Sequence, residues 1–524
     1  MSENTSGNVV FHSSNDFSKE PQDNPAPNDK KVLLIYPPLD SDYFTVGVND
    51  SPPLGLVALK NYLIQKMGRE APTIEIIDGE HQPLAEIQEK IATGAYSIVG
   101  IQAMMASYKT SLEIAAAAKN SGSLVVMGGH HATQLADNIV FNRHEIIDAV
   151  VIRDGEEAML GLVEGKPFPQ IPNLAYWDKT KAKVARTIEK DVPINSNLLL
   201  EFDPDLLELY RKASQKLERG EATSFRAYSH KGCANRLNSQ YCYFCGRADK
   251  GLRFKDERLY LNELVVLSER YGAKYIFEIG DDFMQSDEWL SSLAKIKQRE
   301  FPNLQVELKI FARANRITES NIALLKKLNV TEVAIGFESG SREILNNINK
   351  RTTPEQNLIA AELLFSHGID TVASFVIGLP GETDETLRLT YEQALRVAEL
   401  AQKYLGHKPQ EIIANLIEIN PGSPAFRKVC EKFEKYKSRD LIGVREMQDD
   451  YLRLTFGLDD DASVNDLRAS FAKWGAKING LGNYTYPAGW EKNDMGASSP
   501  ELPSKRCGAS TPISASKQKR PAAE

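Results

Sequence analysis

The sequence predicts an α/β protein: a doubly wound (flavodoxin/Rossmann-like) domain, then a partial (β/α)6 barrel, then a small, mainly helical C-terminal region. Short apolar strands alternate with helical patterns twice along the chain, which is typical of parallel sheets covered by helices. Three of the five cysteines lie in one loop at the start of the second alternation. Ligands of such sheets bind at the carboxyl ends of the strands, so we expect the functional residues there.

The length and charge of the chain limit the possible functions. Its 524 residues suggest about two to four domains. A net charge of -8, from 63 basic and 71 acidic side chains, gives no basic face for nucleic acid. The sequence has no long apolar run and no signal peptide, so we expect a cytoplasmic protein that does not contact a membrane.

Changes in composition divide the chain. Both ends are polar and lack apolar periodicity, which predicts disordered tails; Cys507 lies in the second of them. A proline-containing stretch between the two alternations is predicted to be a connector. The predicted segments are a tail (1–30), a doubly wound domain (31–165), a linker (166–221), a barrel (222–430), a cap (431–490) and a second tail (491–524).

The first alternation contains five expected strands. Helical patterns such as 54–66 and 110–119 separate them. The glycine pair after the fourth strand would let a ligand approach the backbone closely. The expected strands are Val32–Tyr36, Thr73–Ile77, Ser97–Ile101, Leu124–Met127 and Ala149–Ile152.

The second alternation contains six expected strands, and six β/α units would close about three quarters of a barrel. The helical patterns between them are 259–271, 287–300, 318–328, 355–367 and 386–404. The expected strands are Ser224–Tyr228, Lys274–Ile279, Gln305–Phe311, Thr331–Phe337, Val372–Ile377 and Ile412–Ile419.

The cysteine loop holds Cys233, Cys242 and Cys245. A reducing compartment keeps thiols free, so such a loop favours metal or redox chemistry over disulfides. Three thiolates can hold three irons of a 4Fe-4S cluster and leave the fourth open. With His230 they also make a Cys3His set suited to structural zinc. The loop alone leaves both readings open.

An aromatic residue, Phe244, directly precedes Cys245, and the loop follows the first strand of the predicted barrel. In these features the chain resembles the radical S-adenosylmethionine (SAM) enzymes. That family usually has three residues between its first two cysteines, whereas eight separate Cys233 from Cys242 here.

This resemblance, which covers about residues 31–430, places SAM at the strand ends. The second strand would hold its amino group, and Arg313 after the third would bind its carboxylate through two parallel hydrogen bonds. The fourth strand ends in a Glu-Ser-Gly motif, and the fifth in a turn on the adenine side. The SAM-binding residues that it implies are Phe244, Glu278, Gly280, Asp281, Arg313, Glu338, Ser339 and Gly378.

The first domain resembles the cobalamin (B12)-binding domain found in one branch of that family. The similarity rests on residues 52–56, 128–133 and 154–157. The stretch after the first strand, residues 39–44, lacks the histidine that long-studied cobalamin domains supply to cobalt, which implies displacement of the corrin's nucleotide tail without a histidine from that position. The cobalamin-binding residues so implied are Gln102, Ala103, Met104, Ser107, Gly128, Gly129, His131, Thr133 and Glu156.

The resemblance implies a methyltransferase. The cluster would reduce SAM, the resulting 5'-deoxyadenosyl radical would take hydrogen from a small-molecule or peptide substrate of secondary metabolism, and methylcobalamin would methylate the substrate radical at carbon or phosphorus. A second SAM would restore the methyl group, and flavodoxin or ferredoxin would supply electrons. Two alternatives are a non-methylating radical rearrangement or cyclisation, and a zinc-clipped ligand-binding protein. No motif names the substrate or its catalytic contacts.

Overall fold

The computed structural model describes residues 30–40, 51–191, 194, 201–216, 225–239, 241–249, 251–440 and 443–483. The predicted tails, Cys507 and residues 41–44 of the stretch after the first strand lie outside these residues, except for Lys30. No described helix combines the length and the apolar character needed to cross a membrane.

The N-terminal unit is a seven-stranded sheet with the order β2-β1-β3-β4-β5-β6-β7. Its first five strands are parallel, and all five lie where the sequence predicts them. Along β1, Val32 and Leu34 pack on one face and Leu33 and Ile35 on the other, because helices cover both sides of the sheet. These strands are β1 (Lys31–Tyr36), β2 (Thr73–Asp78), β3 (Ile98–Gln102), β4 (Leu124–Gly128) and β5 (Ala149–Val151).

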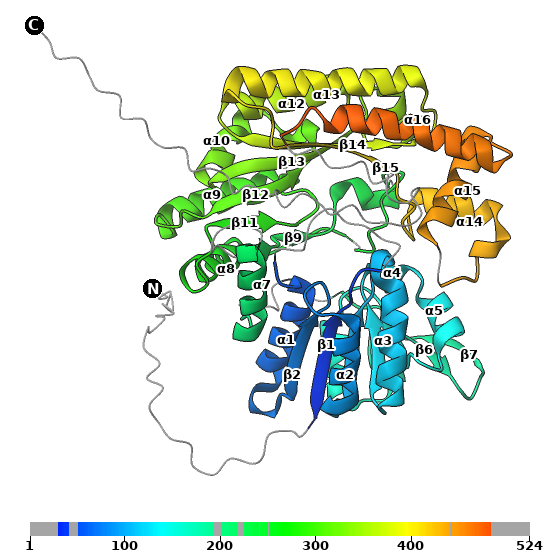
Figure 1. Ribbon diagram of the computed structural model, residues 1–524. Coiled ribbons are helices and arrows are strands. Elements are labelled where there is room, and N and C mark those ends of the chain that lie inside the picture. The colour runs from blue at the N-terminus through cyan, green and yellow to red at the C-terminus, as the bar shows by residue number, and fades with distance from the viewer. Residues whose placement is uncertain are drawn as a thin grey trace, which may run out of the picture.

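Helices α1 and α6 pack together on one face, and α2 packs against α3 on the other. Figure 1 shows this unit in blue and cyan below the barrel strands. Its helices are α1 (Leu54–Met67), α2 (Leu84–Gly94), α3 (Tyr108–Asn120), α4 (His130–Gln134), α5 (Ala136–Arg143) and α6 (Glu156–Val163).

The sheet continues past residue 165 into the stretch predicted as a linker. Strand β6 (Leu174–Asp178) pairs antiparallel with β5, and β7 (Lys183–Arg186) pairs antiparallel with β6. Only one end of β6 is deeply buried, and β7 is half-exposed or exposed throughout, so neither strand has the apolar run that marks a central strand. A helix, α7 (Pro204–Lys216), follows before the barrel.

The second unit is a six-stranded sheet with the order β8-β11-β12-β13-β14-β15, all parallel. The six predicted strands are confirmed in number and position. Polar side chains such as those of Asp256, Ser286 and Thr383 cap the helices that follow. The strands are β8 (Phe225–Ala227), β11 (Tyr275–Glu278), β12 (Glu307–Ala312), β13 (Val330–Glu338), β14 (Asp370–Ile377) and β15 (Glu411–Leu416).

A two-stranded ribbon, which the sequence did not predict, flanks the cysteine loop. It consists of β9 (His230–Lys231) and β10 (Arg253–Phe254). The principal helices around the sheet are α8 (Glu257–Glu269), α9 (Asp287–Glu300), α10 (Glu319–Lys327), α12 (Pro354–Ser366) and α13 (Asp384–Leu405), with a short α11 (Arg342–Asn347) after β13.

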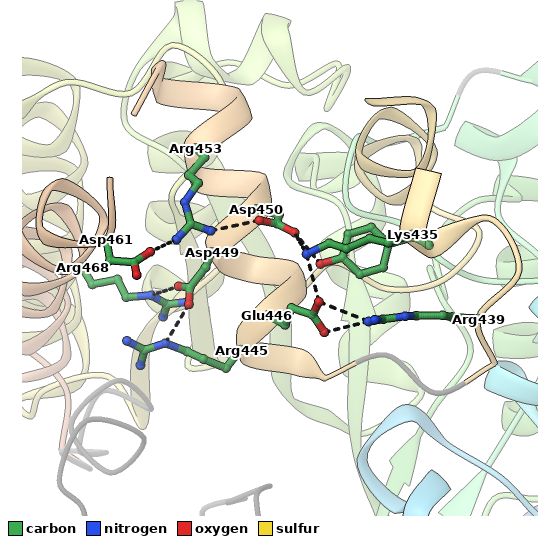
Figure 2. Close-up of polar contacts among 10 residues, drawn as sticks. Lys435, Arg439, Arg445, Glu446, Asp449, Asp450, Arg453, Asp461 and Arg468 are labelled. Carbon is green, nitrogen blue, oxygen red and sulfur yellow. Dashed lines mark hydrogen bonds and ion pairs between the residues drawn. The ribbon is translucent and has the colours of Figure 1, made fainter. Parts of the chain in front are cut away.

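The C-terminal region contains α14 (Pro424–Lys432), α15 (Val444–Phe456) and α16 (Asp461–Asn479). At the open edge of the barrel, the Asn479 side chain of α16 accepts a hydrogen bond of 2.6 Å from the Ala414 amide of β15. Carboxylates along α15 hold this region together (Figure 2): Asp450 pairs with Lys435 and Arg453, while Asp449 binds Arg468 at 2.7 Å.

Candidate functional site

Two cavities meet where the N-terminal sheet faces the barrel. The first, about 360 Å³, lies between the N-terminal unit, where β1, β3, β4, α1 and α6 line it, and the segments that follow β8 and β11 of the barrel. The second, about 730 Å³, holds the three loop cysteines and extends into the barrel. His130, Arg247 and Asp281 line both. Arg247 joins them: its guanidinium donates to His130 Nε2 at 3.0 Å and contacts Asp281 Oδ1 at 3.3 Å.

Cys233, Cys242 and Cys245 all line the second cavity and are free thiols. Asn235 Nδ2 donates to Cys242 Sγ at 3.0 Å, and Arg236 lies 3.9 Å from Cys245 Sγ. These contacts hold the side chains of Cys242 and Cys245 in place at the wall of the cavity. The long spacing after Cys233 is taken up by a short helical turn, Ala234–Ser239, so the loop still brings the three cysteines to one cavity.

Both ring nitrogens of His230 are engaged in hydrogen bonds, so this histidine does not complete a Cys3His set with the loop cysteines. Burial lowers the pKa of His230 to about 4. Its Nε2 accepts a 3.2 Å hydrogen bond from the Asp282 amide, and Nδ1 lies 2.9 Å from Ser229 Oγ. Within the described ranges, no three His, Cys, Asp or Glu side chains are arranged to hold one metal ion. A 4Fe-4S cluster takes each thiolate on a different iron, so its sulfurs need not converge on one point.

Arg313 and Glu338 lie in the same cavity as the cysteines. Glu338 has a left-handed backbone (φ 60°) at an irregularity in the β13–β14 pairing, and its carboxylate pairs with Lys350 at 2.6 Å. A side chain at Gly336 would come within 2.3 Å of that carboxylate. Arg313 donates to the Lys350 carbonyl. Glycine at 336 and strain at 338 thus place a carboxylate, an ammonium and a guanidinium together, which fits the amino-acid part of SAM.

The other residues predicted to bind SAM divide into two groups. Phe244 and Asp281 line the second cavity, and Gly280 lines the first. Glu278, Ser339 and Gly378 are not among the described residues that line either cavity.

Glu278 and Ser339 are fully buried in supporting contacts. The Glu278 carboxylate accepts hydrogen bonds from the Ser229 amide at 2.9 Å and the Gly280 amide at 3.0 Å, so it fixes the ends of β8 and β11 from beneath. The Ser339 hydroxyl lies 3.1 Å from Thr390 Oγ1. The sequence predicted that both residues lie at strand ends, but it did not predict whether each side chain points into the cavity or away from it.

The turn after β14 contains a buried glutamate that the sequence interpretation did not single out. Glu382 accepts hydrogen bonds from the amides of Gly378 and Leu379. Burial raises its pKa to about 8. Tyr451 of α15 donates to the Gly378 carbonyl at 2.9 Å, so the C-terminal region fixes this turn from the other side.

Small residues shape the side of the first cavity that the N-terminal unit forms. Glycines 55, 100, 128 and 155 line it, together with Gln102, Thr133 and Glu156. A Cβ at Gly128 would meet only Val151, at 3.7 Å. At Gly129 (φ +100°) a Cβ would lie 2.6 Å from the Ala103 carbonyl. Gly129 therefore keeps the loop against β3, while Gly128 leaves space for a ligand.

The remaining residues predicted to bind cobalamin lie elsewhere. Met104 and His131 line the second cavity. Ala103 and Ser107 are buried and stabilise the loop: the Ala103 amide donates to the Gly128 carbonyl at 2.7 Å, and Ser107 Oγ accepts from the Met104 amide at 3.3 Å.

His131 joins the N-terminal unit to the C-terminal region. Burial lowers its pKa to about 4, so the ring is neutral. Its Nε2 donates to the Asp440 carbonyl at 3.1 Å, because a carbonyl can only accept. Tyr108 and Arg143 bind the Asp440 carboxylate at 2.8 and 2.6 Å. The position of His131 is therefore set largely by a contact distant in sequence.

Asp154, which follows β5, forms ion pairs between the N-terminal unit and the β9–β10 ribbon. The sequence did not reveal this contact. Its carboxylate binds Lys231 of β9 at 2.8 Å and Arg253 of β10 at 2.8 Å. The side chain is only 6% exposed. Burial raises the pKa of Asp154, but the two cations outweigh it and hold the pKa below its usual range. The ribbon beside the cysteine loop is thereby attached to the N-terminal unit.

Two family models match the chain. The B12 binding domain matches residues 42–163, and the Radical SAM superfamily matches residues 228–394. The matches follow one another in the order that the sequence predicts.

Similar proteins include methyltransferases and a cyclase. An uncharacterised methyltransferase of Pyrococcus horikoshii is 29% identical over 376 residues, covering 70% of this chain and 78% of that protein. An anaerobic magnesium-protoporphyrin IX monomethyl ester cyclase of Rubrivivax gelatinosus is 28% identical over 381 residues, covering 70% and 65%. The structure of the radical SAM methyltransferase TsrM from Kitasatospora setae, with cobalamin and a [4Fe-4S] cluster bound, shares the fold, with a TM-score of 0.59, 17% identity and coverage of 77% and 75%.

Proposed function

This chain is a radical SAM protein with an N-terminal B12-binding domain, and we propose that it is a methyltransferase acting on a carbon or phosphorus centre that lacks a usable nucleophile. Its cofactors are a 4Fe-4S cluster, SAM and cobalamin. The proposed substrate is a small molecule or a peptide of secondary metabolism, and an external protein such as flavodoxin or ferredoxin would supply electrons.

The observation that carries the proposal is the meeting of the two cavities at His130, Arg247 and Asp281. One cavity suits the nucleotide tail of a corrin, and the other holds the three cysteines and the charged groups for SAM. When bound, the cluster and SAM supply a carbon radical and cobalamin supplies a methyl group. Methyl transfer needs both sources next to one substrate, and adjacent cavities allow this.

In this proposal, residues of the chain bind and orient the cofactors and exclude water. Arg313, Glu338 and Lys350 bind the amino acid of SAM, and Phe244 lines the same cavity. The loop glycines leave space for the nucleotide tail. The Asp154 ion pairs hold the cysteine loop's ribbon to the N-terminal unit, and the Asp440 contacts hold the C-terminal region to that unit. Both sets of contacts keep the reacting groups aligned and limit water access.

A second candidate is a radical cyclisation without methyl transfer. It is favoured by the relative from Rubrivivax gelatinosus, which is named as a cyclase and matches over a similar length to the methyltransferase relative. Both reactions would use the same domains, so only the products separate them.

The test is anaerobic turnover of the reconstituted full chain with candidate substrates and methyl-labelled SAM. A methyltransferase of this kind should form one 5'-deoxyadenosine and one S-adenosylhomocysteine for each labelled product, because SAM is consumed once as radical source and once as methyl donor. A cyclase would form no S-adenosylhomocysteine, and a polar methyltransferase no 5'-deoxyadenosine.

A matched pair of variants links that chemistry to the cysteine loop. Replacing Cys233, Cys242 and Cys245 by Ala should abolish bound iron, bound sulfide and 5'-deoxyadenosine, whereas Cys430→Ala should retain all three. Cys430 is a half-buried thiol outside the cavity lining. Zinc without sulfide in the wild-type protein would contradict the proposal.

A further inference from the structure

We infer that the substrate carries a flat, uncharged, unsaturated ring system that binds inside the barrel, against an aromatic wall below the SAM site. This inference rests on the proposed function and adds the class of its substrate. It depends on four features of the second cavity: its depth, its aromatic wall, its small side chains and its charge balance.

The cavity extends well below the SAM-binding residues. The strand register places Phe311 beside Ala334, Ala334 beside Val372, and Val372 beside Glu411, and all four line the cavity. Because a strand rises roughly 3.3 Å per residue, Phe311 lies about 7 Å below Arg313 on the same inward face. The cavity therefore has room for a second ligand beneath SAM.

One wall of this lower part is aromatic. Phe277 of β11 and Phe311 of β12 have ring centroids 4.9 Å apart and an interplanar angle of 46°. Phe311 is 36% exposed, although side chains normally fill a barrel interior. Large apolar side chains left uncovered inside a cavity mark a ligand site, and aromatic rings favour a flat, unsaturated partner.

The neighbouring strands leave space for that partner. The next row of inward positions places Gly336 beside Ser374 and Ser374 beside Ile413, and all three line the cavity. Ala334, Gly336 and Ser374 are small, so β13 and β14 fill less of the lumen than β11 and β12. A ring system could rest on the phenylalanines without displacing the strand that carries Glu338.

Three charged side chains lie at or beside the bottom of the cavity, Lys309, Glu332 and Glu411, and each already has a partner. Lys309 pairs with Glu332 across β12 and β13 and lies 5.2 Å from the centre of the Phe277 ring. The pair is poorly exposed, at 16% and 13%, so a charged ligand group there would have to compete with an existing ion pair. The groups assigned to SAM lie at the opposite end. An uncharged ring body fits this arrangement.

The test uses N-phenylnaphthylamine, a neutral aromatic probe whose fluorescence rises in apolar surroundings, with the full chain loaded with cluster, cobalamin and SAM. We expect about one bound probe per chain. Ser374→Phe, which fills the lumen, should weaken binding by about tenfold or more, and Phe311→Ala by about tenfold. The anionic analogue anilinonaphthalene sulfonate should bind more weakly to the wild-type protein.

The matched control is Phe141→Ala. Phe141 is also an exposed aromatic, at 58%, and it has an aromatic neighbour in Trp177, but it lies on α5, outside both cavities. It should leave probe binding unchanged. Binding of cobalamin and SAM reports whether each variant is folded. If Ser374→Phe does not fold, Phe311→Ala alone tests the inference.

The inference is overturned if the wild-type protein does not bind the probe, if Phe311→Ala binds it normally, if the anionic analogue binds as tightly as the probe, or if the probe binds only to protein prepared without SAM. Those results would leave the proposed methyl transfer standing, because product ratios test it separately. Conversely, if the wild-type protein binds the probe as expected and forms no S-adenosylhomocysteine, that result would support the proposed substrate class and contradict the proposed methyl transfer.

Discussion

At the scale of single residues, Glu382 shows how burial changes the chemistry of a side chain. Its pKa of about 8 lies above its ordinary 4.5 because of burial, although two amides donate to it. The folded protein therefore holds a proton that the unfolded chain releases. Its contribution to stability is complete below pH 4.5 and is lost as pH rises to 8, at about 1.4 kcal/mol per pH unit.

Glu382→Gln should remove this dependence, since an amide keeps the acceptor oxygen and does not titrate. The difference in unfolding free energy between wild type and variant should shift in the variant's favour from pH 5 to pH 8 by about 1.4 kcal/mol per unit. Urea unfolding at several pH values measures it. Glu385→Gln is the control, because Glu385 is exposed and its pKa is lowered by Arg388. Parallel curves for wild type and Glu382→Gln would show that Glu382 is ionised in the fold.

Gly128 lines the first cavity, and substitutions there test cobalamin binding without distorting the backbone. Because a Cβ there meets only Val151 at 3.7 Å, Gly128→Ala should bind hydroxocobalamin normally. Gly128→Leu projects into the cavity and should weaken binding by about tenfold or more while the melting temperature changes little. Absorption titration measures the affinity. Wild-type affinity in Gly128→Leu would place the corrin tail elsewhere.

At the scale of elements, the ribbon of β9 and β10 links the cysteine loop to the N-terminal unit through Asp154. Asp154→Asn would leave Lys231 and Arg253 without their shared counter-ion. For a poorly exposed ion pair, that loss should cost on the order of 3 kcal/mol of unfolding free energy. Chemical denaturation of the full chain measures it.

Asp137→Asn is the matched control for that change, since Asp137 and Arg186 form a pair with side chains 53% and 42% exposed. Its loss should cost less than about 1 kcal/mol. Equal losses in the two variants would mean that the ribbon does not anchor the two units.

The elements also show what a sequence can predict. The parallel strands were predictable because both faces are buried, so each strand is a nearly continuous apolar run. That the three cysteines and Arg313 share one cavity was predictable because they follow such strands; their roles stay a prediction. The directions of Glu278 and Ser339 were not, because local backbone geometry decides which way a side chain points. Asp154 and His131 depend on partners distant in sequence, and no local pattern records these. Glu382 has local partners, the amides of Gly378 and Leu379, but only the fold shows that it is buried.

At the scale of the whole molecule, the boundary of the N-terminal unit matters for any attempt to study it alone. A fragment ending at residue 165, the boundary expected from the sequence, lacks β6 and β7. It would expose the edge of β5 and lose Ile171 and Leu174, both fully buried. Burying one such side chain contributes about 1.5–3 kcal/mol, and an uncovered strand edge favours aggregation.

A fragment ending at residue 191 keeps both antiparallel strands and the Asn173 side chain, which accepts a hydrogen bond from the Lys190 amide at 2.7 Å. We expect fragment 1–191 to be monomeric and to bind hydroxocobalamin, and fragment 1–165 to aggregate or to unfold at much lower urea concentration. Size-exclusion chromatography and urea titration compare them. If both fragments were equally stable, β6 and β7 would be an accessory to the domain rather than part of it, and the expected end at residue 165 would stand.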